Sequence, residues 1–211
     1  MSEKSLSIEE QSLKIIDSEI GNHDYNRDEW FIVRRVIHST ADFDFAKSGK
    51  IIFSKDAIKS AFQALSGNKT IVTDVEMVLS GINKNSMQKI KINAICNISD
   101  KLVIQESRIT NKTRSAVAMR HAIPIIEGGI LVVGNAPTAL FEIINIIHEK
   151  SANPALVIGL PVGFVSAVES KNKIRDIECE YITNLGRKGG SPAASSIINA
   201  LMLLYIEKYL S

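Results

Sequence analysis

One histidine lies at a position where its side chain could transfer a proton to or from a bound ligand. His38 closes an apolar segment, residues 27–38, and directly precedes the polar stretch 39–50. Imidazole changes its charge close to neutral pH, so a histidine at the end of a helix suits proton transfer to or from a ligand. A purely structural histidine is the alternative, and both remain open at this point.

Short stretches rich in glycine, hydroxyl groups and bases follow the expected strands. Glycine lets a ligand approach the backbone closely, and a helix N-terminus offers N–H groups with a partial positive charge. The pattern predicts an anionic ligand laid across several turns, although ordinary capped turns with solvated bases are the alternative. The stretches are Thr73-Asp74, Thr113 to Ser115, Gly134 to Thr138, Gly159 to Gly163, and Gly186 to Ser191.

Several other chemistries lack their sequence signatures. Neither dinucleotide nor nucleotide glycine loops are found, which argues against NAD and ATP. No G-x-S-x-G elbow and no Cys/His spacing for a metal occur, and we expect no metal site. The net charge of +2 is too balanced for a dedicated nucleic-acid binder. No apolar run approaches the ~18 residues of a membrane span, and the start lacks the apolar core of a signal peptide. We therefore expect a soluble cytoplasmic protein with no nucleic-acid or membrane partner.

The elements that must position these residues follow a repeating order. Apolar spacing predicts helices over 7–20 and 27–38, and from residue 70 onward strand, turn and helix alternate. The expected strands are continuous β-branched runs, which are typical of parallel strands covered on both faces. The sequence thus predicts a three-layer α/β/α sandwich with a mainly parallel sheet of about five strands, formed by residues 1–211 as a single domain. In such sheets ligands bind at the carboxyl ends of the strands, where the turns gather.

Six ordered motifs, spanning about residues 7–205, resemble one family: precorrin-8X methylmutase, called cobalt-precorrin-8 methylmutase in the anaerobic route to cobalamin. They are Arg-Val-Ile-His (35–38), Ile-Val-Thr-Asp-Val-x-Met-Val (71–78), Thr-Arg-Ser (113–115), Gly-Asn-Ala-Pro-Thr-Ala-Leu (134–140), Gly-Leu-Pro-Val-Gly-Phe-Val-Ser-Ala-x-Glu-Ser-Lys (159–171) and Gly-Arg-Lys-Gly-Gly-Ser (186–191).

The resemblance implies an isomerase that moves a methyl group from C-11 to C-12 of a corrinoid ring, giving hydrogenobyrinate or its cobalt counterpart, cobyrinate. The family's catalytic histidine corresponds to His38, which would protonate the macrocycle. No cofactor is implied, since any cobalt belongs to the substrate. The resemblance also implies a homodimer with sites close to the subunit interface. Whether the substrate contains cobalt stays open.

A large flat ring with acetate and propionate carboxylates needs many scattered anion contacts, which arginine and helix N-termini supply. Neutral groups would orient the ring or its amides. The predicted substrate-binding residues are Arg35, Arg114, Lys171 and Arg187 as charged groups, Gly189, Gly190 and Ser191 through the backbone, and Thr73 and Asn135 as neutral groups.

Three other functions compete with this interpretation. A non-catalytic corrinoid carrier on the same fold would bind the ligand without converting it. A phosphate-binding enzyme would use the turn at 186–191. The sequence, however, contains neither of the two standard phosphate loops and no metal-binding carboxylate cluster. A purely structural interaction module would not need so many glycine- or hydroxyl-bearing turns along one sheet edge.

Overall fold

The computed structural model describes the backbone of residues 3–210 and the side chains of residues 8–210. The strands are β1 (Ile51–Phe53), β2 (Ile71–Thr73), β3 (Ala94–Ile95), β4 (Ile130–Val133), β5 (Leu156–Gly159) and β6 (Tyr181–Asn184). The α-helices are α1 (Glu3–Ile20), α2 (Arg27–Thr40), α3 (Ala57–Ser66), α4 (Glu76–Gly81), α5 (Lys84–Ile90), α6 (Lys101–Thr110), α7 (Arg114–His121), α8 (Pro137–His148), α9 (Ala167–Lys173) and α10 (Ser191–Tyr209). Three short 3-10 turns are η1 (Phe43–Ala46), η2 (Ile123–Ile125) and η3 (Ile174–Asp176).

The strands form one sheet in the order β1-β6-β5-β4-β2-β3. Strands β2 to β6 pair in parallel, and β1 adds to the edge antiparallel to β6, with Ile52 opposite Thr183. The predicted, mainly parallel sheet is therefore confirmed. The chain steps outward from β2 to β3 and returns on the other side of β2 with β4, so the strand order reverses between β2 and β4. Such a reversal is where open α/β sheets bind ligands.

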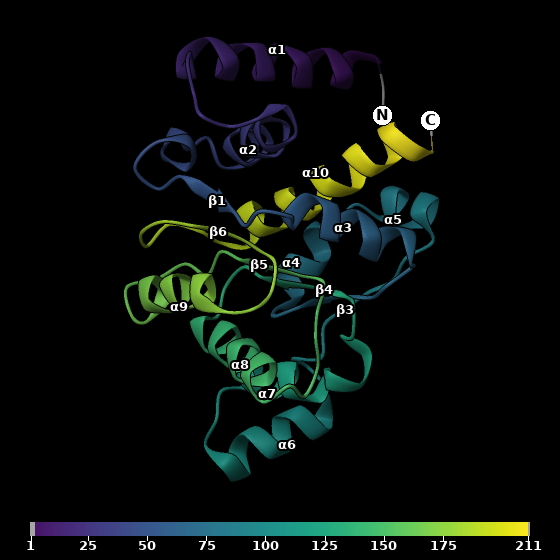
Figure 1. The fold of residues 1–211 in the computed structure, drawn as a ribbon, viewed down its shortest axis with the longest axis vertical. Coiled ribbons are helices and arrows are strands. Elements are labelled where there is room, and N and C mark those ends of the chain that lie inside the picture. The colour runs from purple at the N-terminus through teal and green to yellow at the C-terminus, as the bar shows by residue number, and fades with distance from the viewer. Residues whose placement is uncertain (1–2, 211) are drawn as a thin grey trace.

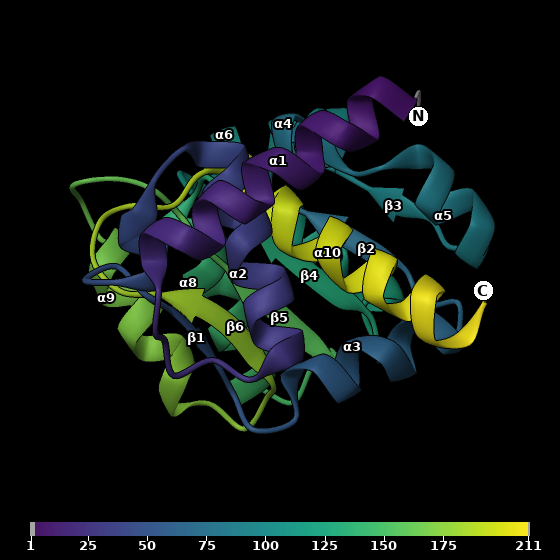
Figure 2. The same cartoon turned by 90° about the horizontal axis from the view of Figure 1, so that it is seen from above.

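Helices cover both faces of the sheet, which confirms the three-layer sandwich. Figure 1 shows α2, α3 and α10 on one face and α7, α8 and α9 on the other. Each face has its own apolar cluster because alternate side chains of the strands point to opposite faces. Helix α1 packs on the outside of α2, and Figure 2 shows it crossing above α2 and α10. No helix in the described part of the chain is long and apolar enough to cross a membrane.

Helices α1 and α2 extend beyond the predicted ranges 7–20 and 27–38. Helix α1 begins at Glu3, four residues earlier, and α2 ends at Thr40, two residues later. Helix α9 begins at Ala167, because Gly163 (φ 152°) and Ser166 (φ 62°) hold non-helical backbone. Residues 160–166 therefore form a loop at the carboxyl end of β5. This loop places Phe164 and Val165 in solvent, with 87% and 81% of their surface exposed.

Candidate functional site

His38 lies exposed in the last turn of α2, and a second helix fixes its imidazole. The hydroxyl oxygen of Ser12, on α1, is 2.7 Å from Nδ1 of His38. This bond occupies one ring nitrogen, and Nε2 has no hydrogen-bond partner among the described residues. The ring is thus held in one orientation with a second nitrogen available to a ligand. The sequence analysis missed Ser12, which is 26 residues away and shows no local signal.

The surroundings of His38 are largely apolar. A groove of about 400 Å³ runs between α1 and α2, and its walls include Ile8, Ile15, Ile37 and Phe43. Ile8 and Ile15 keep 59% and 57% of their surface exposed. Gln11 and Glu19 add polar groups to its wall. A mainly apolar groove with a histidine in its wall suits the flat face of a large ring.

The loop after His38 is tied to the turn at the end of β6. The Lys188 ammonium lies 2.8 Å from a carboxylate oxygen of Asp42 and 2.6 Å from one of Asp44. The hydrogen bond and charge of Lys188 lower the pKa of Asp44. Leu185 also donates its N–H to the Lys50 carbonyl at 3.2 Å. These contacts bring the His38 loop to the carboxyl edge of the sheet.

The turn from Gly186 to Ser191 packs against the loop that follows β5. Gly190, with φ 116°, donates its N–H to the Leu160 carbonyl at 2.9 Å. A Cβ on Gly189 would lie 2.3 Å from the same carbonyl oxygen, so only glycine fits there. The N–H of Gly190 is therefore already used within the protein. The exposed guanidinium of Arg187 lies 5.5 Å from the ring centre of Phe164.

Lys171 lies beneath this turn instead of on the surface. Its side chain is 1% exposed, and its ammonium donates to the carbonyl of Lys188 at 2.7 Å and to Oδ1 of Asn184 at 3.2 Å. Burial lowers the pKa of Lys171 to about 8. Lys171 was predicted to bind the substrate, but its side chain has almost no exposed surface with which to do so.

At the point where the strand order reverses, between β2 and β4, the protein places one of its own carboxylates, that of Asp74. Asp74, fully buried after β2, accepts N–H bonds from Gly134, Asn135 and Ala136 at 3.0, 2.9 and 2.7 Å. Burial raises the pKa of Asp74, and the three N–H donors oppose this. The expected anion site at the start of α8 is therefore filled from within. A ligand there meets the exposed Asn135 side chain instead of bare N–H groups.

Thr73, directly before Asp74, is buried as well. Its hydroxyl donates to the carbonyls of Val75 and Ile95, both at 3.3 Å. It braces the end of β2 against β3. Ser191, the first residue of α10, is also buried, and a Cβ on Gly134 would lie 2.9 Å from its Cα. Both residues lie at the predicted edge, but beneath its surface.

The starts of α7 and α8 lie side by side. Thr113 caps α7 and donates its hydroxyl to that of Thr138, on α8, at 2.8 Å. The exposed Arg114 is thereby brought beside the turn that carries Asn135.

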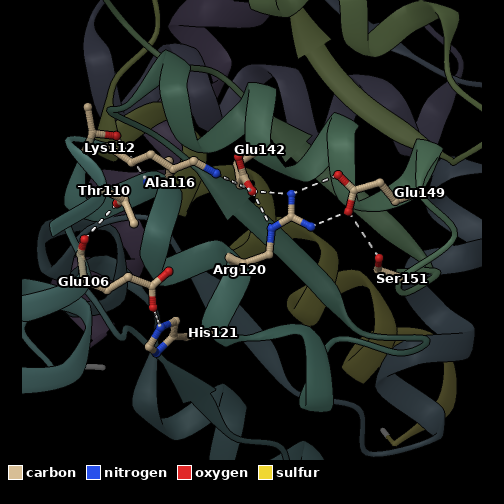
Figure 3. Close-up of polar contacts among 10 residues, drawn as sticks. Glu106, Thr110, Lys112, Ala116, Arg120, His121, Glu142, Glu149 and Ser151 are labelled. Carbon is tan, nitrogen blue, oxygen red and sulfur yellow. Dashed lines mark hydrogen bonds and ion pairs between the residues drawn. The ribbon is translucent and has the colours of Figure 1, made fainter.

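The other ends of these helices are held by ion pairs, as Figure 3 shows. Arg120 on α7 bonds Glu142, which is buried on α8, and Glu149 just beyond α8. His121 pairs with Glu106 of α6 at 2.6 Å. The cluster therefore fixes the direction in which α7 presents Arg114.

Arg35 takes part in the packing of α1 on α2. Its guanidinium pairs with Glu9 and lies 4.6 Å from the ring centre of Phe31. Arg35 is three residues from His38, on the same helix, but its charge is already matched. Within residues 8–210 no group of three His, Cys, Asp or Glu side chains is placed to hold a metal ion.

Comparison with known proteins links this arrangement to one group of enzymes. The family model described as precorrin-8X methylmutase matches residues 7–204. The cobalt-precorrin-8 methylmutase of Priestia megaterium is 44% identical over 93% of this chain and 87% of its own length. That of Leptospira interrogans is also 44% identical, over 94% and 93%. The crystal structure of precorrin-8X methylmutase from Thermus thermophilus superposes with a TM-score of 0.88 at 33% identity, covering 95% of this chain and 96% of the other. The chain belongs to the precorrin-8X methylmutase family and is an isomerase of cobalamin biosynthesis.

Proposed function

We propose that this chain converts cobalt-precorrin-8 to cobyrinate by moving a methyl group from C-11 to C-12, with His38 as the proton donor. The cobalt-containing substrate is favoured because both 44% identical relatives carry that substrate in their names. The reaction consumes no co-substrate, since the product has the same atoms as the substrate, and the proposed mechanism uses no cofactor. The observation that carries the role of His38 is its bond to Ser12 at the edge of an apolar groove.

The chemical work of the protein is small in this reaction. His38 would donate a proton from Nε2 to the macrocycle, and the C-11–methyl bond would break as the C-12–methyl bond forms. The double bonds then rearrange and a proton returns to the imidazole, so the net change is an isomerisation. General acid catalysis of this kind contributes roughly 10²–10⁴-fold.

Binding would rest on the exposed polar groups of the same edge. Arg114 and Arg187 are exposed cations that suit peripheral carboxylates of the ring, and Asn135 suits a carboxylate or amide beside them. Thr73, Lys171, Gly190 and Ser191 support these groups from beneath.

A second copy of the chain would complete the site. The groove beside His38 is open, and Ile8 and Ile15 at its wall are more than half exposed. Apolar residues that line an open groove favour contact with another apolar surface. We propose a homodimer in the cytoplasm that covers α1, and sedimentation of the wild type beside an Ile8→Glu/Ile15→Glu variant tests it. A monomeric wild type would contradict this assembly.

An absorbance experiment tests the function. Purified protein is mixed with cobalt-precorrin-8 and, separately, with precorrin-8X, beside His38→Ala and the control His148→Ala, an exposed histidine at the end of α8. We expect conversion to the product chromophore by the wild type and the control, faster with the cobalt form. His38→Ala should shift the spectrum on binding without converting the ligand. Binding without conversion by the wild type would instead indicate a carrier, and turnover by His38→Ala would refute the role of His38.

A further inference from the structure

Lys171 is a buried cation whose charge no carboxylate matches. The described residues contain no Asp or Glu within ion-pair distance of its ammonium, which instead donates to the Lys188 carbonyl and to Asn184. The amide of Asn184 donates to the same Lys188 carbonyl at 2.9 Å and to the Leu185 carbonyl at 2.9 Å. A buried, unpaired cation is costly, so its retention calls for a reason beyond packing.

The acceptor of this bond belongs to the residue that joins two loops. The backbone of Lys188 is held from below by Lys171 and Asn184, while its side chain reaches Asp42 and Asp44 in the loop after His38. Arg187 precedes it, and the Arg187 carbonyl accepts the N–H of Gly163 at 3.2 Å. One buried ammonium thus underlies the turn that carries Arg187 and the contact that anchors the His38 loop.

We propose that Lys171 is a positioning residue of the methylmutase site, which fixes the Arg187–Lys188 turn from beneath, and that it does not contact the substrate. The inference rests on the proposed site at the carboxyl edge. The turn contains three glycines, at 186, 189 and 190, two of them at positive φ, so its backbone is intrinsically free to adopt other shapes. A charge-assisted bond to the Lys188 carbonyl selects one of them.

This role predicts a separation between binding and chemistry. Loss of the ammonium would let Arg187 leave its place and weaken the hold on substrate carboxylates. His38 keeps its contact with Ser12, so the chemical step would change less. A variant that raises KM while kcat stays constant has lost binding shared by ground state and transition state.

Burial moves the pKa of the Lys171 ammonium to about 8. Of the charged groups that join this turn to the His38 loop, Lys188 has its pKa raised by Asp42 and Asp44, and Asp44 has its pKa lowered by Lys188. The neutral amine keeps donor hydrogens but loses charge assistance, so we expect KM of the wild type to rise above about pH 8.

The experiment compares Lys171→Met, Lys171→Arg and Lys173→Met with the wild type. Lys173 is exposed on the same helix and serves as the matched control. In Lys171→Met we expect KM for cobalt-precorrin-8 to rise about tenfold, as for the loss of one hydrogen bond to a charged group, with kcat within about twofold. Lys171→Arg should recover much of the affinity and remove the rise of KM above pH 8, because guanidinium stays charged. Circular dichroism shows whether each variant folds.

Hydrogen exchange at residues 185–190 keeps the proposal falsifiable even if turnover is lost. We expect faster exchange there in Lys171→Met, with α2 unchanged. A wild-type KM and pH profile in a folded Lys171→Met would overturn the proposal, as would unchanged exchange in the turn. A wild type that converts neither substrate would overturn the proposed function instead, so the two failures are distinguishable.

Discussion

Nδ1 of His38 lies 2.7 Å from the hydroxyl of Ser12, so a helix outside the three layers orients the imidazole of the helix beneath it. Helix α1 lies outside the sheet and its covering layers, and it packs mainly against α2 (Figure 1). Its contribution is therefore to the site as well as to the core. The hydroxyl limits the orientations of a ring that would otherwise be free in solvent.

Removal of this hydroxyl should slow the reaction without weakening binding. For Ser12→Ala we expect kcat to fall about tenfold, the worth of about one hydrogen bond to a charged group, with KM nearly unchanged. Ser18→Ala, exposed on the same helix, is the control. Any residual turnover of His38→Ala should not fall further when Ser12→Ala is added, because the two residues act as one unit. Independent, additive losses would contradict this coupling.

The buried carboxylate of Asp74 should contribute strongly to stability. Asp74→Ala leaves three N–H groups of the turn before α8 without an acceptor, so we expect the free energy of unfolding to fall by about 3 kcal/mol or more. Urea unfolding measures this, and Glu76→Gln, exposed two residues later, should change it little. If Asp74→Ala lowers the free energy of unfolding no more than Glu76→Gln does, the carboxylate does not hold the turn.

The pair between Lys188 and Asp44 should be visible in acid titration. The pKa of Asp44 is lowered in the fold, so its stabilising contribution is present above the ordinary aspartate range and is lost as the pH falls. In Lys188→Met we expect the pKa of Asp44 to rise toward its ordinary value, which NMR of the carboxyl carbon measures. High salt should shift the wild-type value in the same direction, since exposed charges are screened. An unchanged pKa in Lys188→Met would show that the ion pair does not form in solution.

The ion pairs of Figure 3 should stabilise the packing of α7, the helix that carries Arg114, against α6 and α8. Arg120→Met leaves the buried carboxylate of Glu142 with Lys112, 4.0 Å away, as its one cationic partner among the described residues, so we expect a loss of about 3 kcal/mol of unfolding free energy. The double variant Arg120→Met/Glu142→Leu should recover part of this, because no charge then remains buried. Thermal or urea unfolding of the three proteins tests it, and a double variant less stable than Arg120→Met would contradict the explanation.

Local patterns in the amino-acid sequence were enough to predict the main helices and strands and the family. Continuous β-branched runs such as Ile130–Val133 indicate covered parallel strands, and the parallel sheet follows from their alternation with helices. His38, Arg114 and Asn135 could be singled out because a strand's carboxyl end or a helix end is a local feature. The six ordered motifs identified the family, which the comparisons confirm.

The contacts of each side chain could not be predicted from these local patterns, because they join segments that are distant in the sequence. Asp74 reaches N–H groups 60 residues further along the chain, and Ser12 reaches His38 across 26 residues. A lysine is usually a solvated cation, yet Lys171 is buried. Its ammonium is accommodated there because it donates to Asn184 and to the Lys188 carbonyl, which come from another part of the chain. Sequence patterns report periodicity and local backbone preference. Contacts between distant segments depend on how helices and loops pack on the sheet, and that packing separates exposed ligand groups from those that support them.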